Sequence, residues 1–388
     1  MRDFRADLIK TIPPSGIRTF FDLVIGMDEV ISLGVGEPDF ITPWHICESA
    51  IYSIEKGMTS YTSNLGLLEL REAISVYLAK SFSVTYNPQE EVLITVGASE
   101  AMDLAFRAIL NPGDEVILLE PSYVAYAPIV TLAGGTPVCV SLIKGDKLEV
   151  DFDEIESKIT KKTKALFINY PNNPTGKSFN KDELLHFAQL AEKYDLIVVS
   201  DEIYAELTYD YKHICFSTIE GMRDRTIIIS GFSKAFAMTG WRIGYACAPH
   251  DIIEAMMKIH QYSMLCAPIT GQMAAITALQ RGTQDVRLMK KEYKQRRHII
   301  VDGFNKLDLF CANPEGAFYV FPSIKRLPFS SEEFCLKLLQ EEVVAVVPGT
   351  AFGEAGEGFI RCAYAASIEN IKEALHRIEN FLKRHNLM

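Results

Sequence analysis

The chain has 388 residues, of which 48% are apolar and 23% charged, a composition typical of a soluble globular protein with a large core. Its 39 basic and 50 acidic residues give a formal net charge of −11, which argues against nucleic acid or an anionic membrane as a partner. Eight scattered cysteines without metal-ligand spacing, no signal-peptide pattern and no long apolar run predict a reduced, cytoplasmic protein.

The N-terminal part of the chain contains one glycine motif, Gly34-Val-Gly36-Glu-Pro-Asp39. It superficially resembles a dinucleotide-binding loop, but it lacks the third glycine and a helix start behind it, so we reject that interpretation. Because glycine lets a backbone come close to a ligand, we expect Gly36 to border a bound carboxylate.

Short apolar runs alternate with helical patterns between residues 91 and 248. The expected strands are Glu91–Val96, Glu115–Leu119, Pro137–Ser141, Ala165–Asn169, Leu196–Ser200, Thr226–Ser230 and Ile243–Ala248. The expected helices are Glu100–Leu110, Tyr123–Ala133, Phe152–Thr160 and Asp182–Tyr194. This alternation is typical of an α/β fold in which helices cover both faces of a mostly parallel seven-stranded sheet.

The last hundred or so residues show longer helical patterns and shorter strands. Helices are expected at Asp285–Leu307, Ser331–Glu341 and Ile368–His385, with strands at Ala317–Phe321, Ala345–Val347 and Gly358–Cys362. We interpret the N-terminal arm, residues 1–41, together with residues 281–388 as one smaller α/β domain. Residues 42–280 would then form a large domain.

Polar or aromatic residues follow five of the expected strands. They are Ala98 with Ser99, Tyr123, Asn173, Asp201 and Lys234. In an open parallel sheet, ligands bind beyond the carboxyl ends of the strands. We therefore expect these residues to meet at one edge of the sheet and to form a ligand site.

The most specific of these positions is Lys234, in Ser-Gly-Phe-Ser-Lys234-Ala-Phe-Ala-Met-Thr-Gly-Trp-Arg242-Ile-Gly. An exposed lysine is protonated at neutral pH, whereas a lysine among apolar groups and beside a second cation has an amine free to attack an aldehyde. The alternative is an exposed lysine at a helix start. With Arg242 and the upstream motifs, the stretch predicts a pocket for pyridoxal phosphate in which Lys234 forms the Schiff base.

Asp201 ends a run of buried-strand character in the motif Asp201-Glu-Ile-Tyr204. A buried carboxylate needs a cationic partner, and the pyridinium nitrogen of the cofactor would supply it; the alternative is a helix N-cap. Tyr204 and Asn173 would donate to the phenolic oxygen, with Asn173 held by the turn Pro174-Thr-Gly176. Tyr123 would stack on the ring, unless it is a core aromatic.

The phosphate of the cofactor requires hydrogen-bond donors and positive charge. The segment Gly97-Ala98-Ser99 opens an expected helix, and helix N-termini bind anions through free N–H groups. Ser233 would add a hydroxyl group, and Arg242 would add a bidentate, charge-assisted contact.

A second arginine, Arg361, lies inside the apolar run Phe359–Tyr364. Bidentate pairing with a guanidinium suits the α-carboxylate of an amino acid. The alternative is a structural salt bridge.

Assembled, these residues resemble the class I and II aminotransferases, a large family that uses pyridoxal phosphate. The resemblance covers essentially the whole chain, from the Gly34–Asp39 motif through Tyr61-x-x-x-x-Gly-x-x-x-Leu-Arg71 to Arg361. The block around Lys234 is highly specific. The D-E-I-Y and N-N-P-T-G motifs are closest to prokaryotic aspartate, aromatic and N-acetyl-diaminopimelate aminotransferases.

The resemblance implies fold type I and a homodimer with shared sites, in which Tyr61 reaches the phosphate of the neighbouring subunit. It implies that Lys234 carries a proton between the substrate Cα and the cofactor, that Asp201 pairs with the pyridinium and that Arg361 binds the α-carboxylate. Aspartate-specific members usually carry a basic residue for the distal carboxylate. No such residue can be placed here, and Glu100 would repel an acid.

We therefore predict an aminotransferase that moves the amino group of an L-amino acid, aromatic or aspartate-like, to a 2-oxo acid such as 2-oxoglutarate. Acetylated diamino acids are also admissible donors. Arg18, Tyr61 and Tyr262 are candidate residues of the side-chain pocket.

Two other functions are compatible with parts of this pattern. A carbon–sulfur lyase or cyclising synthase would use the same lysine, aspartate and arginine. A regulator that senses an effector would need a DNA-binding domain, and the roughly 30 residues before Gly34 are too few for one.

Overall fold

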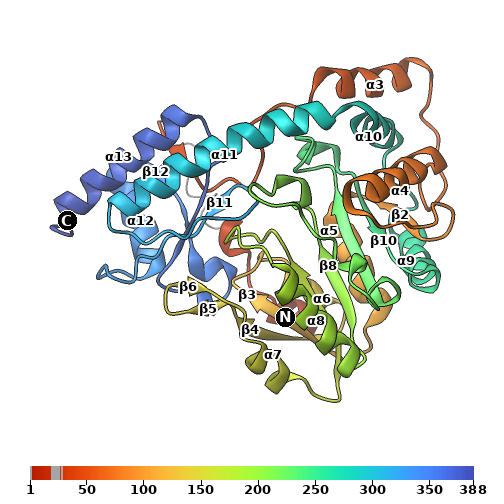
Figure 1. Ribbon diagram of the computed structural model, residues 1–388, viewed down its shortest axis with the longest axis horizontal. Helices are drawn as coiled ribbons and strands as arrows, with labels where there is room; N and C mark the ends of the chain where they lie inside the picture. Colours follow the sequence, from red (N-terminus) through yellow and green to blue (C-terminus); the bar gives the residue numbers. More distant parts are fainter. Residues whose placement is uncertain (1, 19–26, 28) are drawn as a thin grey trace.

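The computed structural model describes residues 2–18, 27 and 29–388 of the chain. Its centre is a seven-stranded sheet with the strand order β2-β10-β9-β8-β7-β3-β4 (Figure 1). The strands are β2 (Val92–Thr95), β3 (Glu115–Glu120), β4 (Thr136–Ser141), β7 (Thr163–Asn169), β8 (Ile197–Asp201), β9 (Thr226–Gly231) and β10 (Gly244–Cys247). β10 runs antiparallel to both of its neighbours, and the other pairs are parallel. The α/β class with a mostly parallel seven-stranded sheet is confirmed.

Helices cover both faces of this sheet because its strands are apolar on both sides. The helices are α3 (Trp44–Glu55), α4 (Leu68–Phe82), α5 (Gly97–Ile109), α6 (Tyr126–Leu132), α7 (Phe152–Lys158), α8 (Lys181–Lys193), α9 (His250–Ser263) and α10 (Ile269–Arg281). Val116 and Leu118 of β3 share a buried cluster with α5 and α6. Ile117 and Leu119 share another with α7 and α8, since successive side chains of a strand point to opposite faces.

The C-terminal part has its own sheets and its own core. It contains α11 (Thr283–Lys306), α12 (Ser331–Glu342), α13 (Ile368–Arg384), and the antiparallel sheet of β11 (Tyr319–Val320), β14 (Ile360–Ala363) and β13 (Val347–Pro348). One buried cluster joins the three helices to this sheet, and Figure 1 shows α12 and α13 on the side away from α3, whereas α11 extends from them toward α10.

The N-terminal part of the chain joins this second region through a short strand. β1 (Ile31–Ser32) pairs in parallel with β12 (Val344–Ala345). The division into residues 42–280 and residues 1–41 with 281–388 stays a prediction, and residues 1, 19–26 and 28 of the arm lie outside the described residues.

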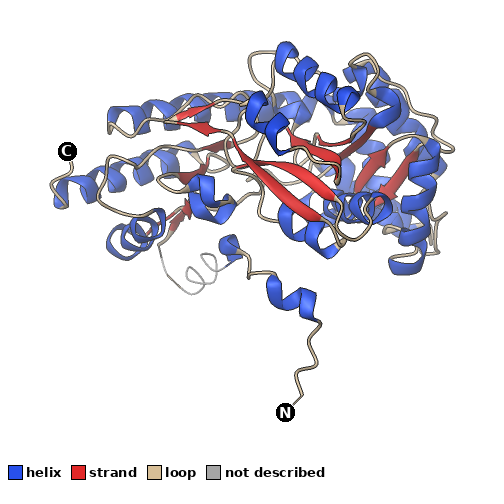
Figure 2. Ribbon diagram, turned by 90° about the horizontal axis from the view of Figure 1, so that it is seen from below, coloured by secondary structure: helices blue, strands red, loops and turns tan. Residues whose placement is uncertain are grey.

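Short elements complete the described chain. They are α1 (Asp7–Thr11), the hairpin β5 (Ile143–Lys144) with β6 (Lys147–Leu148), and 3₁₀ helices at Ala205–Leu207, Phe216–Thr218, Arg223–Arg225, Thr239–Trp241, Gly349–Phe352 and Glu354–Gly356. None of the residues of α1 is buried, and Figure 2 shows the first residues extending outward from the body of the molecule. Among the described residues, the helices all lack the length and apolar character that crossing a membrane requires.

The direction of the strands decides where a site can form. Because β2, β3, β7, β8 and β9 run parallel within one sheet, their carboxyl ends open on the same edge. The segments that follow them therefore meet there, as the general rule for open α/β sheets requires.

Two neighbouring leucines of α8 test this account of the core. Leu184 is fully buried, whereas Leu185 is 37% exposed. We expect Leu184→Ala to lower the free energy of unfolding by about 2–5 kcal/mol because it leaves a cavity. The control Leu185→Ala should cost less than about 1 kcal/mol. Urea unfolding of both variants measures the difference, and equal losses would contradict the packing of α8 described here.

Candidate active site

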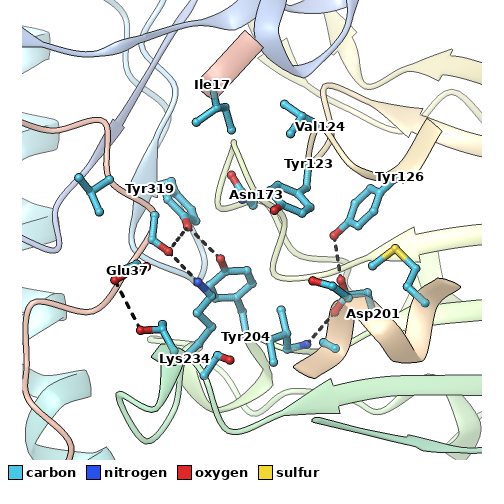
Figure 3. A pocket seen from close by; sticks show the side chains of 18 of the residues that line it. Ile17, Glu37, Tyr123, Val124, Tyr126, Asn173, Asp201, Tyr204, Lys234 and Tyr319 are labelled. Atoms are coloured by element: carbon cyan, nitrogen blue, oxygen red, sulfur yellow. Dashed lines mark hydrogen bonds between the residues drawn. The ribbon is translucent and has the colours of Figure 1, made fainter. Parts of the chain in front are cut away.

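A cavity of about 870 Å³ lies at the edge of the sheet where these strands end. It is lined by nearly all the site residues predicted from the sequence: Gly36, Ala98, Ser99, Tyr123, Asn173, Asp201, Tyr204, Ser233, Lys234, Arg242 and Arg361. Figure 3 shows several of these side chains pointing toward one another from separate elements. The expectation that successive strand ends build one site is therefore met.

Lys234 lies in the connection that follows β9, and its side chain is partly buried. Its Nζ donates a hydrogen bond to the carbonyl oxygen of Gly36 at 2.6 Å. Withdrawal from water lowers the pKa of Lys234 to about 8, and the cations Arg361 and Arg242 act in the same direction while Glu37 opposes them. About one amine in ten is then unprotonated at pH 7, far more than for an exposed lysine. The alternative of an exposed lysine at a helix start does not describe this residue.

Asp201 is the last residue of β8, and it is buried. One carboxylate oxygen accepts a hydrogen bond from the hydroxyl of Tyr126 at 2.9 Å, and the other accepts one from the backbone N–H of Ile203 at 3.1 Å. Burial raises the pKa of Asp201 to about 6, and the neighbouring charge of Glu202 adds to the rise. Within the described residues Asp201 forms no salt bridge, so a cation in the cavity would be its first charged partner.

The N-terminus of α5 forms an anion site with Arg242. Gly97, the first residue of this helix, has φ of +77°, and a Cβ on it would lie 2.6 Å from a guanidinium nitrogen of Arg242. A Cβ on Gly244 would collide with the backbone nitrogen of Ala98. The two glycines thus let the guanidinium lie against the free N–H groups of the helix, with the hydroxyl groups of Ser99 and Ser233 on the same cavity wall. This combination of donors suits a phosphate group.

Arg361 of β14 is a buried cation on another wall of the cavity, with 1% of its surface exposed. It donates hydrogen bonds to the side-chain oxygen of Asn173 at 3.2 Å and to the carbonyl oxygen of Gly34. Its Nε is buried without a hydrogen-bond partner among the described residues. Since no carboxylate pairs with it there, the alternative of a structural salt bridge is not what the described residues show. A guanidinium with an unused donor suits an incoming carboxylate.

The remaining predicted contacts come from turns after two strands. The Asn172 side-chain oxygen accepts hydrogen bonds from the backbone N–H and hydroxyl of Thr175 at 3.1 and 2.7 Å, which fixes the turn that carries Asn173. Tyr123 follows β3, lines the cavity and packs edge-on against Tyr126. The hydroxyl of Tyr204 lies 2.9 Å from that of Tyr319.

The remaining candidate residues have different outcomes, and the expected reach of Tyr61 to a neighbouring subunit stays a prediction. Tyr61 and Tyr262 are 83% and 88% exposed and do not line the cavity of their own chain. Arg18, in contrast, lines it. Glu100 was expected to face the cavity but does not. Its carboxylate accepts a hydrogen bond from the backbone N–H of Val96 and contacts His260 Nδ1 at 2.7 Å. The inference that it repels an acidic substrate was therefore wrong.

Two tyrosines of the site escaped the sequence analysis. Tyr126 contacts Asp201, and Tyr319 contacts Tyr204. In the sequence, each is a tyrosine within an apolar segment. A tyrosine of the hydrophobic core looks the same, so this pattern does not identify a site residue.

Pyridoxal phosphate fits this set of residues. Its ring nitrogen, phosphate and aldehyde are matched by the buried carboxylate of Asp201, the donors around Arg242 and the amine of Lys234. The unused Nε of Arg361 remains for a carboxylate brought by a second molecule.

Comparison with known proteins agrees with this geometry. The family model described as aminotransferase class I and II matches residues 28–378. The aspartate aminotransferase of Pyrococcus abyssi is 45% identical over 98% of this chain and 99% of its own length. The aromatic-amino-acid aminotransferase 2 of Thermococcus litoralis is 42% identical over 99% of both chains. The structure of the aspartate aminotransferase from Thermus thermophilus with maleate superposes with a TM-score of 0.93 at 36% identity, covering 98% of this chain and 100% of that one.

The raised pKa of Asp201 gives a pH dependence to the cofactor-free protein. Because the folded state holds this proton more tightly than the unfolded chain does, the contribution of Asp201 to stability is complete below its ordinary pKa of 3.8 and is lost as the pH rises through about 6. The loss is about 3 kcal/mol above pH 6. Asp201→Asn mimics the protonated carboxyl group and should remove this loss of stability.

We expect the cofactor-free Asp201→Asn protein to unfold at a higher urea concentration than the parent at pH 8, and at a similar one at pH 4. The exposed Asp302 of α11 provides the control Asp302→Asn. If Asp201→Asn and the parent show the same pH dependence, the carboxylate is not the uncompensated charge inferred here.

Proposed function

The chain belongs to the class I and II aminotransferases, which use pyridoxal 5′-phosphate, and we propose that it transfers the amino group of an aromatic or aspartate-like L-amino acid to a 2-oxo acid such as 2-oxoglutarate. The observation that carries this proposal is the cavity itself, where the Lys234 amine, the uncompensated Asp201 carboxylate and the unused Arg361 donor meet. The alternative of a carbon–sulfur lyase or synthase is favoured by none of the findings.

When bound, the cofactor supplies a carbon that takes up the amino group and a ring that accepts the electron pair left when Cα loses its proton. Lys234 Nζ would remove that proton and return it at the neighbouring carbon, which its lowered pKa permits near neutral pH. Asp201 would keep the ring nitrogen protonated. Burial raises the pKa of Asp201, because its negative charge is costly away from water, so pairing with the positive ring nitrogen would be favourable.

The substrate would be held by its carboxylate. Arg361 would bind the α-carboxylate, with the side chain of Asn173 and the carbonyl oxygen of Gly34 fixing the guanidinium. Because the Nε donor has no other partner among the described residues, a neutral group at this position would leave a buried cation unpaired. This favours amino and 2-oxo acids over amines.

The remaining site residues would hold the cofactor. Asn173 and Tyr204 would donate to its phenolic oxygen, and Tyr123 would stack on its ring. Ala98, Ser99, Ser233 and Arg242 would bind its phosphate. Each assignment is supported by the place of these residues on the cavity wall.

The cavity residues that would face the substrate's side chain support the two substrate classes named above. Ile17, Val35 and Val124 form an apolar wall that suits an aromatic ring. Arg18 lines the same cavity and adds a cation that suits a second carboxylate. The relatives named for aspartate and for aromatic amino acids show the same two preferences.

A homodimer in the cytoplasm, acting in amino-acid metabolism, completes the proposal. The segments around Tyr61 and Tyr262 lie together, since the side chain of Asn64 donates to the carbonyl oxygen of Leu265 at 2.7 Å. Both tyrosines and Met264 are largely exposed, and an exposed apolar patch of this kind is typical of an interaction surface. In the dimer, Tyr61 would reach the phosphate in the partner's site. The eight cysteines form no disulfides, which suits a reducing compartment.

Substitution of the lysine tests the assigned chemistry. We expect Lys234→Ala to lower the rate of transamination by about 10⁴-fold or more, because no second lysine of the described residues lines the cavity and could move the proton. The control Lys258→Ala changes a lysine of α9 whose side chain is 61% exposed and should retain full activity. The measurement is 2-oxo acid release from a panel of L-amino acids, together with the visible absorption of the cofactor. Substantial turnover by Lys234→Ala would contradict the role proposed for Lys234. Ammonia and pyruvate as products would point to the lyase.

A mixing experiment tests the shared site. Tyr61→Ala and Lys234→Ala should each be impaired as homodimers when excess cofactor is removed. A mixed dimer contains one native site, made from Lys234 of one subunit and Tyr61 of the other, so random exchange should restore about a quarter of wild-type activity. Activity no greater than the mean of the two variants would contradict a site built across the interface.

A further inference from the structure

Tyr319 connects the two halves of the site, although no role has been assigned to it so far. It lies on β11, is fully buried and lines the cavity. Tyr319 pairs with Ala363 of β14, so Arg361, two residues from Ala363, lies on the same face of this small sheet. The guanidinium carbon of Arg361 is 4.8 Å from the centroid of the Tyr319 ring. The ring therefore supports the residue proposed to bind the α-carboxylate.

The hydroxyl group of Tyr319 faces two acceptors. It lies 2.9 Å from the hydroxyl oxygen of Tyr204 and 3.4 Å from the carbonyl oxygen of Gly36 (Figure 3). That carbonyl oxygen already accepts a hydrogen bond from Lys234 at 2.6 Å. A hydroxyl group has one proton to donate, and a contact of 3.4 Å is too long for a strong O–H···O bond. In the short contact either hydroxyl group can be the donor, so Tyr319 can give its proton to Tyr204 when Tyr204 donates its own proton to another acceptor.

With Tyr319 as the donor, the proton of Tyr204 is available to the cavity. An oxygen that accepts from Tyr319 directs its own O–H elsewhere, and the cavity is where the phenolic oxygen of the cofactor would lie. Burial raises the pKa of Tyr319 to about 12 and raises that of Tyr204 well above its usual value. Both tyrosines therefore keep their protons at neutral pH, and the chain of two donors stays intact.

We propose that Tyr319 is a positioning residue, which aims the Tyr204 hydroxyl at the phenolic oxygen of the bound cofactor and supports the Arg361 guanidinium with its ring. The inference rests on the role proposed above for Tyr204. It separates two tasks within one side chain: the hydroxyl acts on the cofactor, and the ring acts on the substrate carboxylate.

Tyr319→Phe removes the hydroxyl and keeps the ring, so it tests the first task. A donor at the phenolic oxygen stabilises its charged form and lowers the pKa of the proton held at that end of the cofactor. We expect the pH midpoint of the bound cofactor's visible absorption change to rise by about half a unit to one unit in the variant. We expect kcat to fall about threefold to tenfold while KM for the amino acid stays within about twofold, because the ring still supports Arg361.

Three further variants make the result specific. Tyr364→Phe is the matched control, because this buried tyrosine also loses hydroxyl contacts, to Tyr209 and to the Ala317 carbonyl oxygen, but lies outside the cavity lining; its midpoint should not move. In Tyr204→Phe the midpoint should rise, and adding Tyr319→Phe to it should shift the midpoint no further. Tyr319→Leu removes the ring as well and should raise KM about tenfold.

The outcomes separate this inference from the one on which it rests. If Tyr204→Phe leaves the midpoint unchanged, the proposed role of Tyr204 fails, and the role of the Tyr319 hydroxyl fails with it. If Tyr204→Phe shifts the midpoint but Tyr319→Phe does not, or if the two shifts simply add in the double variant, only the inference about Tyr319 is overturned. A shift of equal size in Tyr364→Phe would mean general loosening of the region and would also overturn it.

Discussion

The site depends on two buried charges that do not meet. The Asp201 carboxylate ends β8 of the large sheet, whereas the Arg361 guanidinium lies on β14 of the small sheet. Taking an ion out of water costs several kcal/mol unless an opposite charge compensates it, and these two would neutralise each other in a collapsed structure. The two sheets hold them on separate walls of one cavity. In the proposed function, bound molecules would compensate these charges, the cofactor ring at Asp201 and a substrate carboxylate at Arg361.

The same electrostatic arrangement explains the lysine. Lys234 lies in the same cavity as Arg361 and Arg242, whose charges disfavour its protonated form, while its surroundings deprive it of water. The carbonyl oxygen of Gly36 gives its amine a hydrogen-bond acceptor. In the proposed function, Arg242 and Arg361 would bind a phosphate and a carboxylate and would also help to keep the amine of Lys234 reactive near neutral pH.

Much of this site could be predicted from the sequence because one geometric rule places it. Five strand ends of a parallel sheet must converge, and the residues after them are read directly from the chain, as Asn173 and Asp201 illustrate. The direction in which a side chain points could not be predicted in the same way. Glu100 is adjacent in sequence to the anion site but turns to His260, and Tyr319 reaches the cavity from a two-residue strand whose partner is set by tertiary pairing. Helices α3, α4, α9 and α10 were not predicted either. The apolar residues of α4 are spread around the helix, whereas α9 is as amphipathic as the predicted helix α8 and could have been identified from its pattern.

The reversal at β10 has a consequence for how such a protein can change. A single connection, residues 232–243, carries both Lys234 and Arg242 and is anchored at each end by adjacent antiparallel strands. The spacing between the Lys234 amine and the Arg242 guanidinium is therefore set by a short covalent segment. The walls facing a substrate side chain, in contrast, come from scattered segments that include Ile17, Val35 and Val124. In the proposed function, substitutions there would change which side chain is accepted and would leave the segment that carries Lys234 and Arg242 unchanged. New specificities could then be acquired in one group of residues while the reactive group and the anion site are inherited together.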